Sequence, residues 1–186
     1  SNVKRMLAFS SVSHAGYLLL GVLVYNWVGI SAVLFYFVVY SVMNLGAFSI
    51  IAIVEKDDTG TTFKDYRGLA AKHPWLAISM GIFMVSLAGF PPTAGFIAKY
   101  GLLSAAAGNN YIWLVIIVVL NTILSAYYYL RLIVNMYMKD EDATVKPKYG
   151  AMNQVFVGLL ALIILLLGIT PGFLLNIADK AATTVF

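Results

Sequence analysis

Long apolar runs alternate with short polar segments along this chain. No Lys, Arg, Asp or Glu occurs between Arg5 and Glu55, in residues 73–98, in residues 100–130 or in residues 149–178. A helix needs about 20 consecutive apolar residues to cross roughly 30 Å of hydrocarbon, and every one of these runs reaches that length. The pattern therefore predicts an all-α polytopic membrane protein with five transmembrane helices. We expect them within a single domain of residues 1–186, at residues 6–24, 28–54, 74–107, 111–138 and 152–178.

The third span is too long for one straight crossing. Its 34 residues would extend about 51 Å as a continuous helix. Pro91 and Pro92 remove two backbone donors and clash with the preceding turn, while Gly89 and Gly95 flank them with a freer backbone. We predict a helix, an unwound stretch at Pro91-Pro92 and a second helix. In a membrane, unwound backbone occurs only where protein buries it or where it lines a wet cavity, and broken helices often mark transport sites.

The charge distribution indicates membrane topology rather than binding to a nucleic acid. Charged residues make up 11% of the chain, against about 25% in soluble domains. Nine Lys and Arg residues lie in segments expected on one side of the membrane and one lies on the other: Lys4, Arg5, Lys56, Lys64, Arg67, Lys72, Lys139, Lys146 and Lys148 against Lys180. The positive-inside rule then places the N-terminus of this segment in the cytoplasm and its C-terminus outside a bacterial inner membrane, in contact with lipid.

Lys99 lies inside the third span, early in its second half-helix. A charged side chain at the bilayer centre costs about 2.5–3.5 kcal/mol on insertion scales, so such residues usually face a bundle interior or a wet cavity. One interpretation is a lysine beside a structural proline kink, whose side chain snorkels toward the outer surface about 12 Å away. The other, which we favour, is a buried lysine that gains and loses a proton near neutral pH, as an arginine cannot do.

His14 lies in the first span, where Ser10, His14 and Tyr17 share one helical face. A lone histidine in an apolar helix can be a hydrogen-bonded packing residue. Because histidine titrates near neutrality, a polar stripe around it suits a hydrated proton path equally well. Both interpretations stay open at this point.

Further polar side chains lie in the second and fourth spans. Tyr36, Tyr40 and Asn44 form a stripe that we expect to bond helix to helix, with Tyr40 and Asn44 as candidates for the lining of a path. Arg131 lies about two turns from the cytoplasmic loop and is expected to snorkel or to anchor two helices. The tyrosines at 127–129 point in three directions on a helix, so they cannot all line one path.

The composition limits the chemistry that this chain can carry. It has no cysteine and only two histidines, which lie far apart in the sequence. Disulfides, thiolate metal sites and ordinary iron–sulfur sites are therefore excluded, and no histidine-based metal site is evident. The sequence also has no GxGxxG or P-loop motif for a nucleotide. We expect no catalytic, metal-binding or cofactor-binding residue in this chain, and no nucleic-acid partner.

Four segments resemble the antiporter-like membrane subunits of bacterial-type NADH:quinone oxidoreductase, respiratory complex I. They are NVKRMLAFSSVSHAGYLLLG, YRGLAAKHPWLA, SLAGFPPTAGFIAKY and SAYYYLRLIV. A proline-rich break followed by Gly-Phe-Ile-x-Lys is specific within that wider family. A sister subunit tends to have glutamate at the lysine position, so Lys99 favours the subunit N branch.

The resemblance implies a bundle of fourteen transmembrane helices, built from two inverted five-helix repeats and flanking helices, of which this chain matches helices ten to fourteen. It implies that residues 74–107 are the broken helix twelve, that Lys99 belongs to the outward-leading half of a proton path, and that a hydrated central axis passes near His14. The family's glutamate and lysines on helices five, seven and eight have no counterpart in these 186 residues. We therefore expect the missing N-terminal helices of the subunit as a partner, either on a second chain or as the rest of a longer one.

The expected function is proton translocation, as a subunit of the proton-pumping NADH:quinone oxidoreductase. The resemblance implies other membrane subunits as partners, including neighbouring antiporter-like subunits. It places NADH, FMN, iron–sulfur clusters and quinone in other subunits, and no cofactor in this chain. Two alternatives stay open: a subunit of a multi-subunit sodium–proton antiporter, which shares the fold, and a purely structural membrane subunit.

Overall fold

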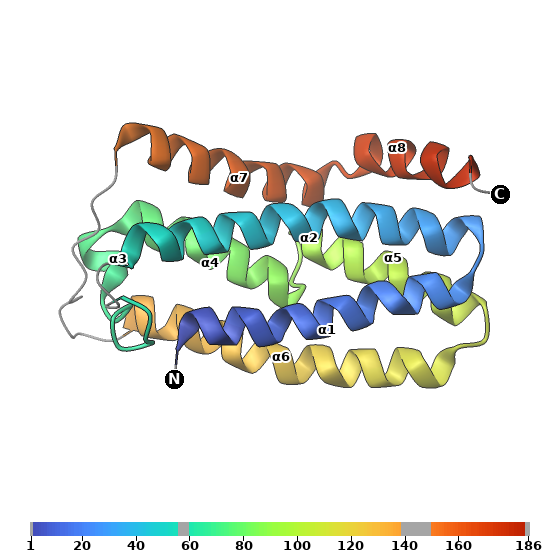
Figure 1. The fold of residues 1–186 in the computed structure, drawn as a ribbon, viewed down its shortest axis with the longest axis horizontal. Helices are drawn as coiled ribbons and strands as arrows, with labels where there is room; N and C mark the ends of the chain where they lie inside the picture. Colours follow the sequence, from blue (N-terminus) through green and yellow to red (C-terminus); the bar gives the residue numbers. More distant parts are fainter. Residues whose placement is uncertain (1, 56–59, 139–149, 185–186) are drawn as a thin grey trace.

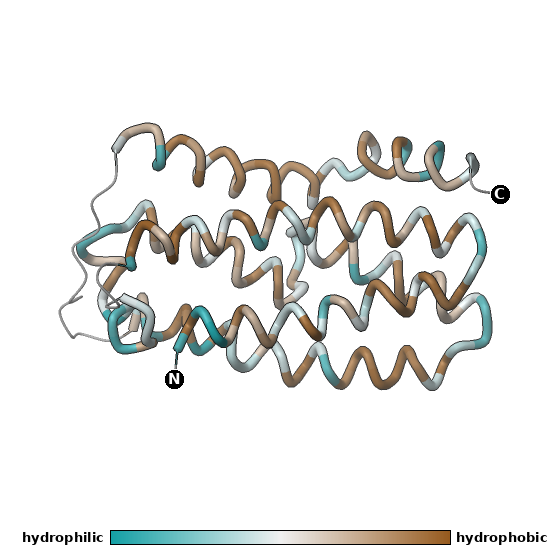
Figure 2. Tube along the Cα trace, in the orientation of Figure 1, coloured by the Kyte–Doolittle hydropathy of each residue, from teal (hydrophilic) through white to brown (hydrophobic). Residues whose placement is uncertain are grey.

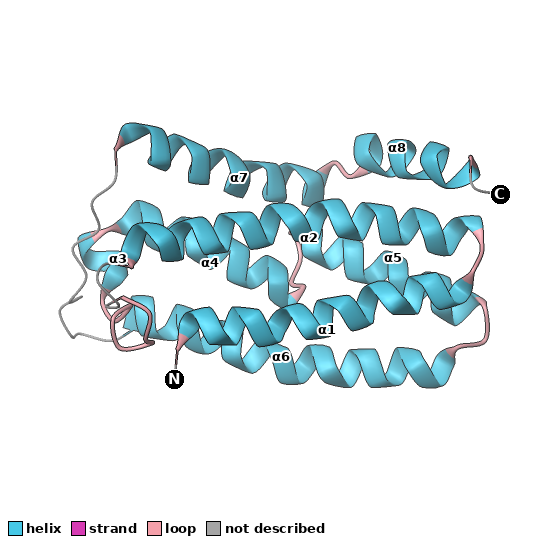
Figure 3. Ribbon diagram, in the orientation of Figure 1, coloured by secondary structure: helices cyan, strands magenta, loops and turns pink. Residues whose placement is uncertain are grey.

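The computed structural model describes residues 2–55, 60–138 and 150–184, and the regular structure in these ranges is helical apart from one isolated bridge between Asn2 and Thr62 (Figure 1, Figure 3). The helices are α1 (Val3–Val24), α2 (Trp27–Val54), α3 (Leu69–Lys72), α4 (Pro74–Ala88), α5 (Ala94–Gly108), α6 (Ile112–Met138), α7 (Ala151–Ile169) and α8 (Gly172–Thr183). Most of them lie side by side along one long axis. The all-α fold predicted from the hydrophobic pattern is therefore confirmed.

Successive helices run back and forth along the bundle, and the two ends of the chain lie toward opposite ends of it (Figure 1). In the described part of the chain, four helices are each long and apolar enough to span a membrane: α1, α2, α6 and α7. The remaining passage is made by α4 and α5 in succession, each of 15 residues. Each of these two helices is about 22 Å long, which is less than the hydrocarbon thickness, so only the pair completes a crossing.

The last expected span, residues 152–178, is two helices rather than one. Helix α7 ends at Ile169 and α8 begins at Gly172. Pro171 accounts for the interruption, because its ring has no N–H to donate and clashes with the preceding turn. The expected span is therefore divided at Pro171-Gly172, where a proline is expected to kink or end a helix.

Local polar residues set the ends of the first two helices. The side chains of Asn2 and Asn26 cap α1 and α2 by accepting hydrogen bonds from the backbone N–H groups of Arg5 and Gly29. Hydrophobic positions dominate the helices, while hydrophilic ones gather in the turns at the two ends of the bundle (Figure 2). This distribution matches a bundle whose middle lies in hydrocarbon and whose ends lie in water.

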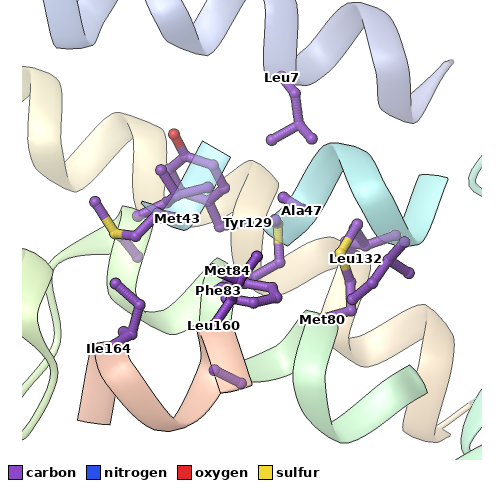
Figure 4. Packing of buried hydrophobic residues seen from close by; sticks show 14 of the residues in the cluster. Leu7, Met43, Ala47, Met80, Phe83, Met84, Tyr129, Leu132, Leu160 and Ile164 are labelled. Atoms are coloured by element: carbon purple, nitrogen blue, oxygen red, sulfur yellow. The ribbon is translucent and has the colours of Figure 1, made fainter. Parts of the chain in front are cut away.

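Helix α2 runs through the centre of the bundle and contacts α1, α4, α5, α7 and α8. The buried side chains around it include Met43 and Ala47 of α2, Phe83 of α4 and Leu160 of α7 (Figure 4). Helix α4 also packs against α6. At the junction between α4 and α5, Ala88 and Thr93 are buried, whereas residues 90–92 between them are exposed on the surface of this chain. Protein packing therefore covers the two helix ends, and the middle of the unwound segment faces outward.

Candidate functional site

The break between α4 and α5 falls where the sequence predicted it. Helix α4 ends at Ala88, Gly89 follows with a left-handed φ of 87°, and α5 begins at Ala94. The segment between the helices contains Pro91 and Pro92, joined by a cis peptide bond. Two half-helices thus meet end to end inside the bundle, and each has a terminus with backbone groups that need partners.

Lys99 folds back across this break toward the end of α4. Its Nζ atom donates hydrogen bonds to the backbone carbonyls of Leu87, at 2.9 Å, and Ala88, at 3.1 Å. The residue is only 6% exposed. Its ammonium group also lies over the ring of Tyr17, 5.2 Å from the ring centroid. The side chain is therefore held inside the protein and does not snorkel to the outer surface.

The ammonium of Lys99 completes the C-terminal cap of α4. The last four carbonyls of an α-helix have no partner within the helix. Those of residues 85 and 86 accept hydrogen bonds from the backbone N–H groups of Gly89 and Phe90, and those of Leu87 and Ala88 accept from Lys99. The C-terminal end of a helix carries partial negative charge, so this position favours a cation. Within the described residues, Lys99 forms no ion pair with a carboxylate.

Two glycines leave the space that this arrangement needs. A Cβ atom at Gly89 would lie 2.9 Å from Cδ and 3.3 Å from Nζ of Lys99. A Cβ atom at Gly95 would collide with the backbone carbonyl of Ser86, although the φ angle of Gly95 is not positive. The sequence predicted both glycines for their flexibility. At Gly95 the structure shows that the lack of a side chain matters instead.

Ser86 is a member of this site that the sequence analysis missed. Its Oγ atom accepts a hydrogen bond of 3.0 Å from the backbone N–H of Gly95, on the other side of the break. The side chain is fully buried. A serine just before a proline-rich break is a weak signal, because serine side chains in helices commonly bond a backbone carbonyl of their own helix.

A second polar cluster surrounds His14, which is 1% exposed. The Nδ1 atom of His14 lies 2.7 Å from the hydroxyl of Tyr36, and its Nε2 atom lies 3.2 Å from the hydroxyl of Tyr129. The Tyr129 hydroxyl also bonds the hydroxyl of Ser10. The His14 ring stacks on Tyr40, with 4.5 Å between the ring centroids. The cluster thus joins α1, α2 and α6 through side chains that can exchange protons or pass them on.

Tyr17 lies between this cluster and Lys99. Its ring meets the His14 ring edge-on at 5.6 Å, and Lys99 approaches the same ring. The Tyr17 hydroxyl accepts hydrogen bonds from Asn121, at 3.0 Å, and Thr122, at 3.4 Å, both on α6. Tyr17 therefore contacts both candidate proton-exchanging groups through its ring, and its hydroxyl is held by α6.

The structure groups most of the predicted polar residues as the sequence suggested. Ser10, His14 and Tyr17 share a buried face of α1, and Tyr40 stacks on His14. Asn44 bonds only the Tyr40 hydroxyl of its own helix, at 3.3 Å, among its described hydrogen bonds, so it joins the cluster indirectly.

The three successive tyrosines of α6 do diverge, as their helical positions predicted. Tyr129 is 1% exposed and belongs to the His14 cluster, whereas Tyr127 is 70% exposed. The sequence could not identify which of the three points inward, because the apolar positions of α6 surround them on several faces. Arg131, the third ionisable residue considered, lies apart, with its guanidinium 5.3 Å from the centroid of the Phe63 ring.

The chemistry available in this site is proton exchange. Among residues 2–55, 60–138 and 150–184, no three His, Asp or Glu side chains are grouped to hold a metal ion. The buried side chains are instead a lysine, a histidine, tyrosines and serines, which donate and accept protons or hydrogen bonds. They lie near a helix break, where backbone carbonyls are free to accept from a cation.

Comparisons with known proteins agree with the resemblance seen in the sequence. A family model described as "NADH:quinone oxidoreductase/Mrp antiporter, TM" matches residues 1–125. The chain is 45% identical over 190 residues to NADH-quinone oxidoreductase subunit N of Trichlorobacter lovleyi, covering 99% of this chain and 38% of that protein. The chain is also 40% identical to NADH-quinone oxidoreductase subunit N of Coxiella burnetii, and this match covers 97% of this chain and 38% of that protein. The chain thus spans a little over a third of the length of these curated relatives.

Solved structures share the same fold. A chain of respiratory complex I from Thermus thermophilus is 30% identical and matches with a TM-score of 0.83, over 95% of this chain and 40% of that chain. A chain of the Mrp complex from a Dietzia species matches with a TM-score of 0.84, over 96% of this chain and 42% of that chain. The second is only 23% identical, so it is evidence for the fold alone.

Proposed function

Since this chain belongs to the NADH:quinone oxidoreductase/Mrp antiporter transmembrane family, we propose that it forms the outward-leading half of a proton path in a complex I membrane subunit of the subunit N type. The Lys99 side chain takes up the proton as a neutral amine and releases it from the ammonium form. The observation that carries this proposal is the position of that ammonium, buried at the end of α4 on two backbone carbonyls.

In this proposal Lys99 has two distinguishable states. As a cation it donates strong hydrogen bonds to Leu87 and Ala88 and is favoured by the negative end of α4. As a neutral amine it is a weaker donor and loses the attraction of the helix end. No carboxylate among the described residues fixes the positive charge by an ion pair. A change in the surrounding field or hydration can therefore tip Lys99 between the two states, which an arginine would not allow.

The His14 cluster serves this proposal as the approach to Lys99. Hydroxyl groups of Ser10, Tyr36 and Tyr129 can each donate and accept a hydrogen bond, and His14 can exchange a proton through either ring nitrogen. Tyr17 separates the cluster from Lys99 by an aromatic ring, which carries no exchangeable proton on its face. The last transfer to Lys99 then runs past the edge of Tyr17 through water.

The rest of the activity belongs to other parts of the assembly in this proposal. The remainder of the subunit supplies the inward-leading half of the path, and neighbouring antiporter-like subunits and lipid surround it. NADH oxidation and quinone reduction, with FMN and iron–sulfur clusters, take place in other subunits. The protein lies in the bacterial inner membrane, with the Val3 end of α1 at the cytoplasmic side and α8 at the outer side.

The test is to change Lys99 to Ala in the full-length subunit within the assembled complex. Inverted membrane vesicles then report NADH-driven proton uptake, while NADH oxidation and the amount of assembled complex are measured in the same preparation. We expect a normal amount of complex and a loss of most proton uptake per NADH. Normal proton uptake would contradict the proposal and leave a structural role for this chain.

A second candidate function is that of a subunit in a multi-subunit sodium–proton antiporter. It is favoured by the family description, which covers both kinds of protein, and by the fold shared with the Mrp complex chain. The two functions differ in their dependence on sodium. A proton flux in vesicles that requires a sodium gradient would favour the antiporter, and a flux that requires NADH and persists without sodium would favour complex I.

A further inference from the structure

Ser86 connects the two half-helices on either side of the break. It lies in the last turn of α4, is fully buried, and accepts the backbone N–H of Gly95 through its Oγ atom. The two residues are nine positions apart and belong to different helices. The hydrogen bond therefore fixes the position of the start of α5 relative to the end of α4.

This hydrogen bond replaces the usual cap of α5. The first N–H groups of a helix need acceptors, which a Ser, Thr, Asp or Asn at the N-cap normally supplies. The N-cap residue here is Thr93, and its side chain makes no capping bond to α5. The hydroxyl of Thr93 donates instead to the carbonyl of Phe90. Ser86 of α4 therefore supplies the acceptor for the start of α5 that Thr93 does not supply.

Lys99 lies one helical turn beyond Gly95, so the anchor at Gly95 determines where the lysine side chain starts. Its two acceptors, Leu87 and Ala88, directly follow Ser86 in α4. The caps are reciprocal: Ser86 of α4 satisfies the start of α5, and Lys99 of α5 satisfies the end of α4. A shift of α5 along its axis would change the hydrogen bonds of both caps at once.

We propose that Ser86 is a positioning residue for Lys99, holding α5 in the register in which the ammonium reaches both carbonyls of α4. This inference rests on the proposed function, because it concerns the group that carries the proton. Ser86 acts through the Gly95 N–H and does not itself exchange the transported proton. Removing its hydroxyl leaves the N–H of Gly95 buried without its acceptor and frees the start of α5 to move.

The experiment uses the full-length subunit in the assembled complex, with Ser86→Ala as the main variant and Ser86→Cys as a variant of similar volume with a weaker acceptor. Ser79→Ala is the matched control, because Ser79 is a buried serine of the same helix, two turns before Ser86. The readouts are protons taken up per NADH oxidised and the dependence of that ratio on pH, each normalised to assembled complex.

We expect Ser86→Ala to lower the proton-to-NADH ratio by about three- to tenfold, the range for the loss of one buried hydrogen bond. The proton-to-NADH ratio of Ser86→Cys is expected to lie between the ratios of Ser86→Ala and the unchanged protein. Ser86→Ala is also expected to displace the pH of half-maximal uptake by about half a unit or more, because the bonds to the charged form of Lys99 change. Ser79→Ala is expected to leave both readouts unchanged.

A Ser86→Ala variant that matches Ser79→Ala in ratio and pH dependence would overturn the inference. So would failure of both Ser86 variants to assemble while Ser79→Ala assembles, because Ser86 would then act in folding. The Lys99→Ala experiment separates this inference from the proposed function. If Lys99→Ala loses proton uptake and Ser86→Ala keeps it, only the role of Ser86 fails; if Lys99→Ala pumps normally, the proposed function itself fails.

Discussion

Gly89 leaves the space through which the Lys99 side chain passes, since a Cβ atom at Gly89 would lie 2.9 Å from Cδ of Lys99. Gly89 also has a φ of 87°, which an L side chain adopts at a cost of roughly 1–2 kcal/mol. Gly89→Ala is therefore expected to destabilise the break and to push Lys99 off its carbonyls. The midpoint temperature of thermal denaturation of the assembled complex should decrease, and so should proton uptake per NADH.

The control for this change is Gly81→Ala in the same helix, because a Cβ atom at Gly81 would have no atom within 4 Å apart from its chain neighbours and the adjacent backbone of its own helix. That change should be neutral or slightly stabilising, as alanine favours a helix more than glycine does. Equal effects of the two substitutions would show that the contact between Gly89 and Lys99 does not matter.

The break could be predicted from the sequence because it follows from length and backbone chemistry. A 34-residue apolar span exceeds the membrane thickness, and Pro91 and Pro92 can be accommodated only where the helix is interrupted. The direction of the Lys99 side chain could not be predicted in the same way. Helical spacing gives the face of α5 on which Lys99 lies, but its acceptors, and the partner of Ser86, lie across the break and depend on how the half-helices meet.

Tyr129 is the residue that joins Ser10 to His14, through hydrogen bonds of its one hydroxyl to both. Tyr129→Phe keeps the buried ring and removes that connection. If the cluster carries protons toward Lys99, this variant should lose at least about half of its proton uptake per NADH, since both hydrogen bonds of that hydroxyl are removed from a buried network. The measurement is the same vesicle assay, with NADH oxidation in parallel.

Tyr127→Phe is the matched control, two residues away in α6 and 70% exposed. It should have no effect. Unchanged proton uptake in Tyr129→Phe would mean that the His14 cluster holds the helices together without carrying protons, which is the packing interpretation of His14.

The His14 cluster also marks the limit of prediction from a single sequence. Ser10, His14 and Tyr17 were found together because they repeat at helical spacing on one helix. Tyr129 comes from α6, more than 100 residues later in the chain. Only the packing of α6 against α1 brings its hydroxyl to His14, and nothing in the local pattern of α6 distinguishes Tyr129 from its two tyrosine neighbours.

Gly168 of α7 packs directly against the backbone of the break. A Cβ atom there would overlap the carbonyl of Pro92 and the backbone of Thr93 and Ala94. Gly168→Val should therefore displace the start of α5 and destabilise the protein by about 1–3 kcal/mol, the usual cost of overpacking. The thermal midpoint of the assembled complex should decrease. Gly172→Ala, at a position with open space around it, is the control, and a midpoint lowered equally by both changes would contradict this account.

The central claim is that Lys99 releases its proton, and Lys99→Arg tests it most directly. Arginine keeps the positive charge and can still donate to the carbonyls of Leu87 and Ala88, but it does not lose its proton in a protein. The decisive measurement is the number of protons taken up per NADH oxidised by vesicles that contain the assembled variant complex. The account predicts normal assembly with a proton-to-NADH ratio well below that of the unchanged protein. A ratio equal to that of the unchanged protein would contradict it, because a permanently charged residue would then suffice.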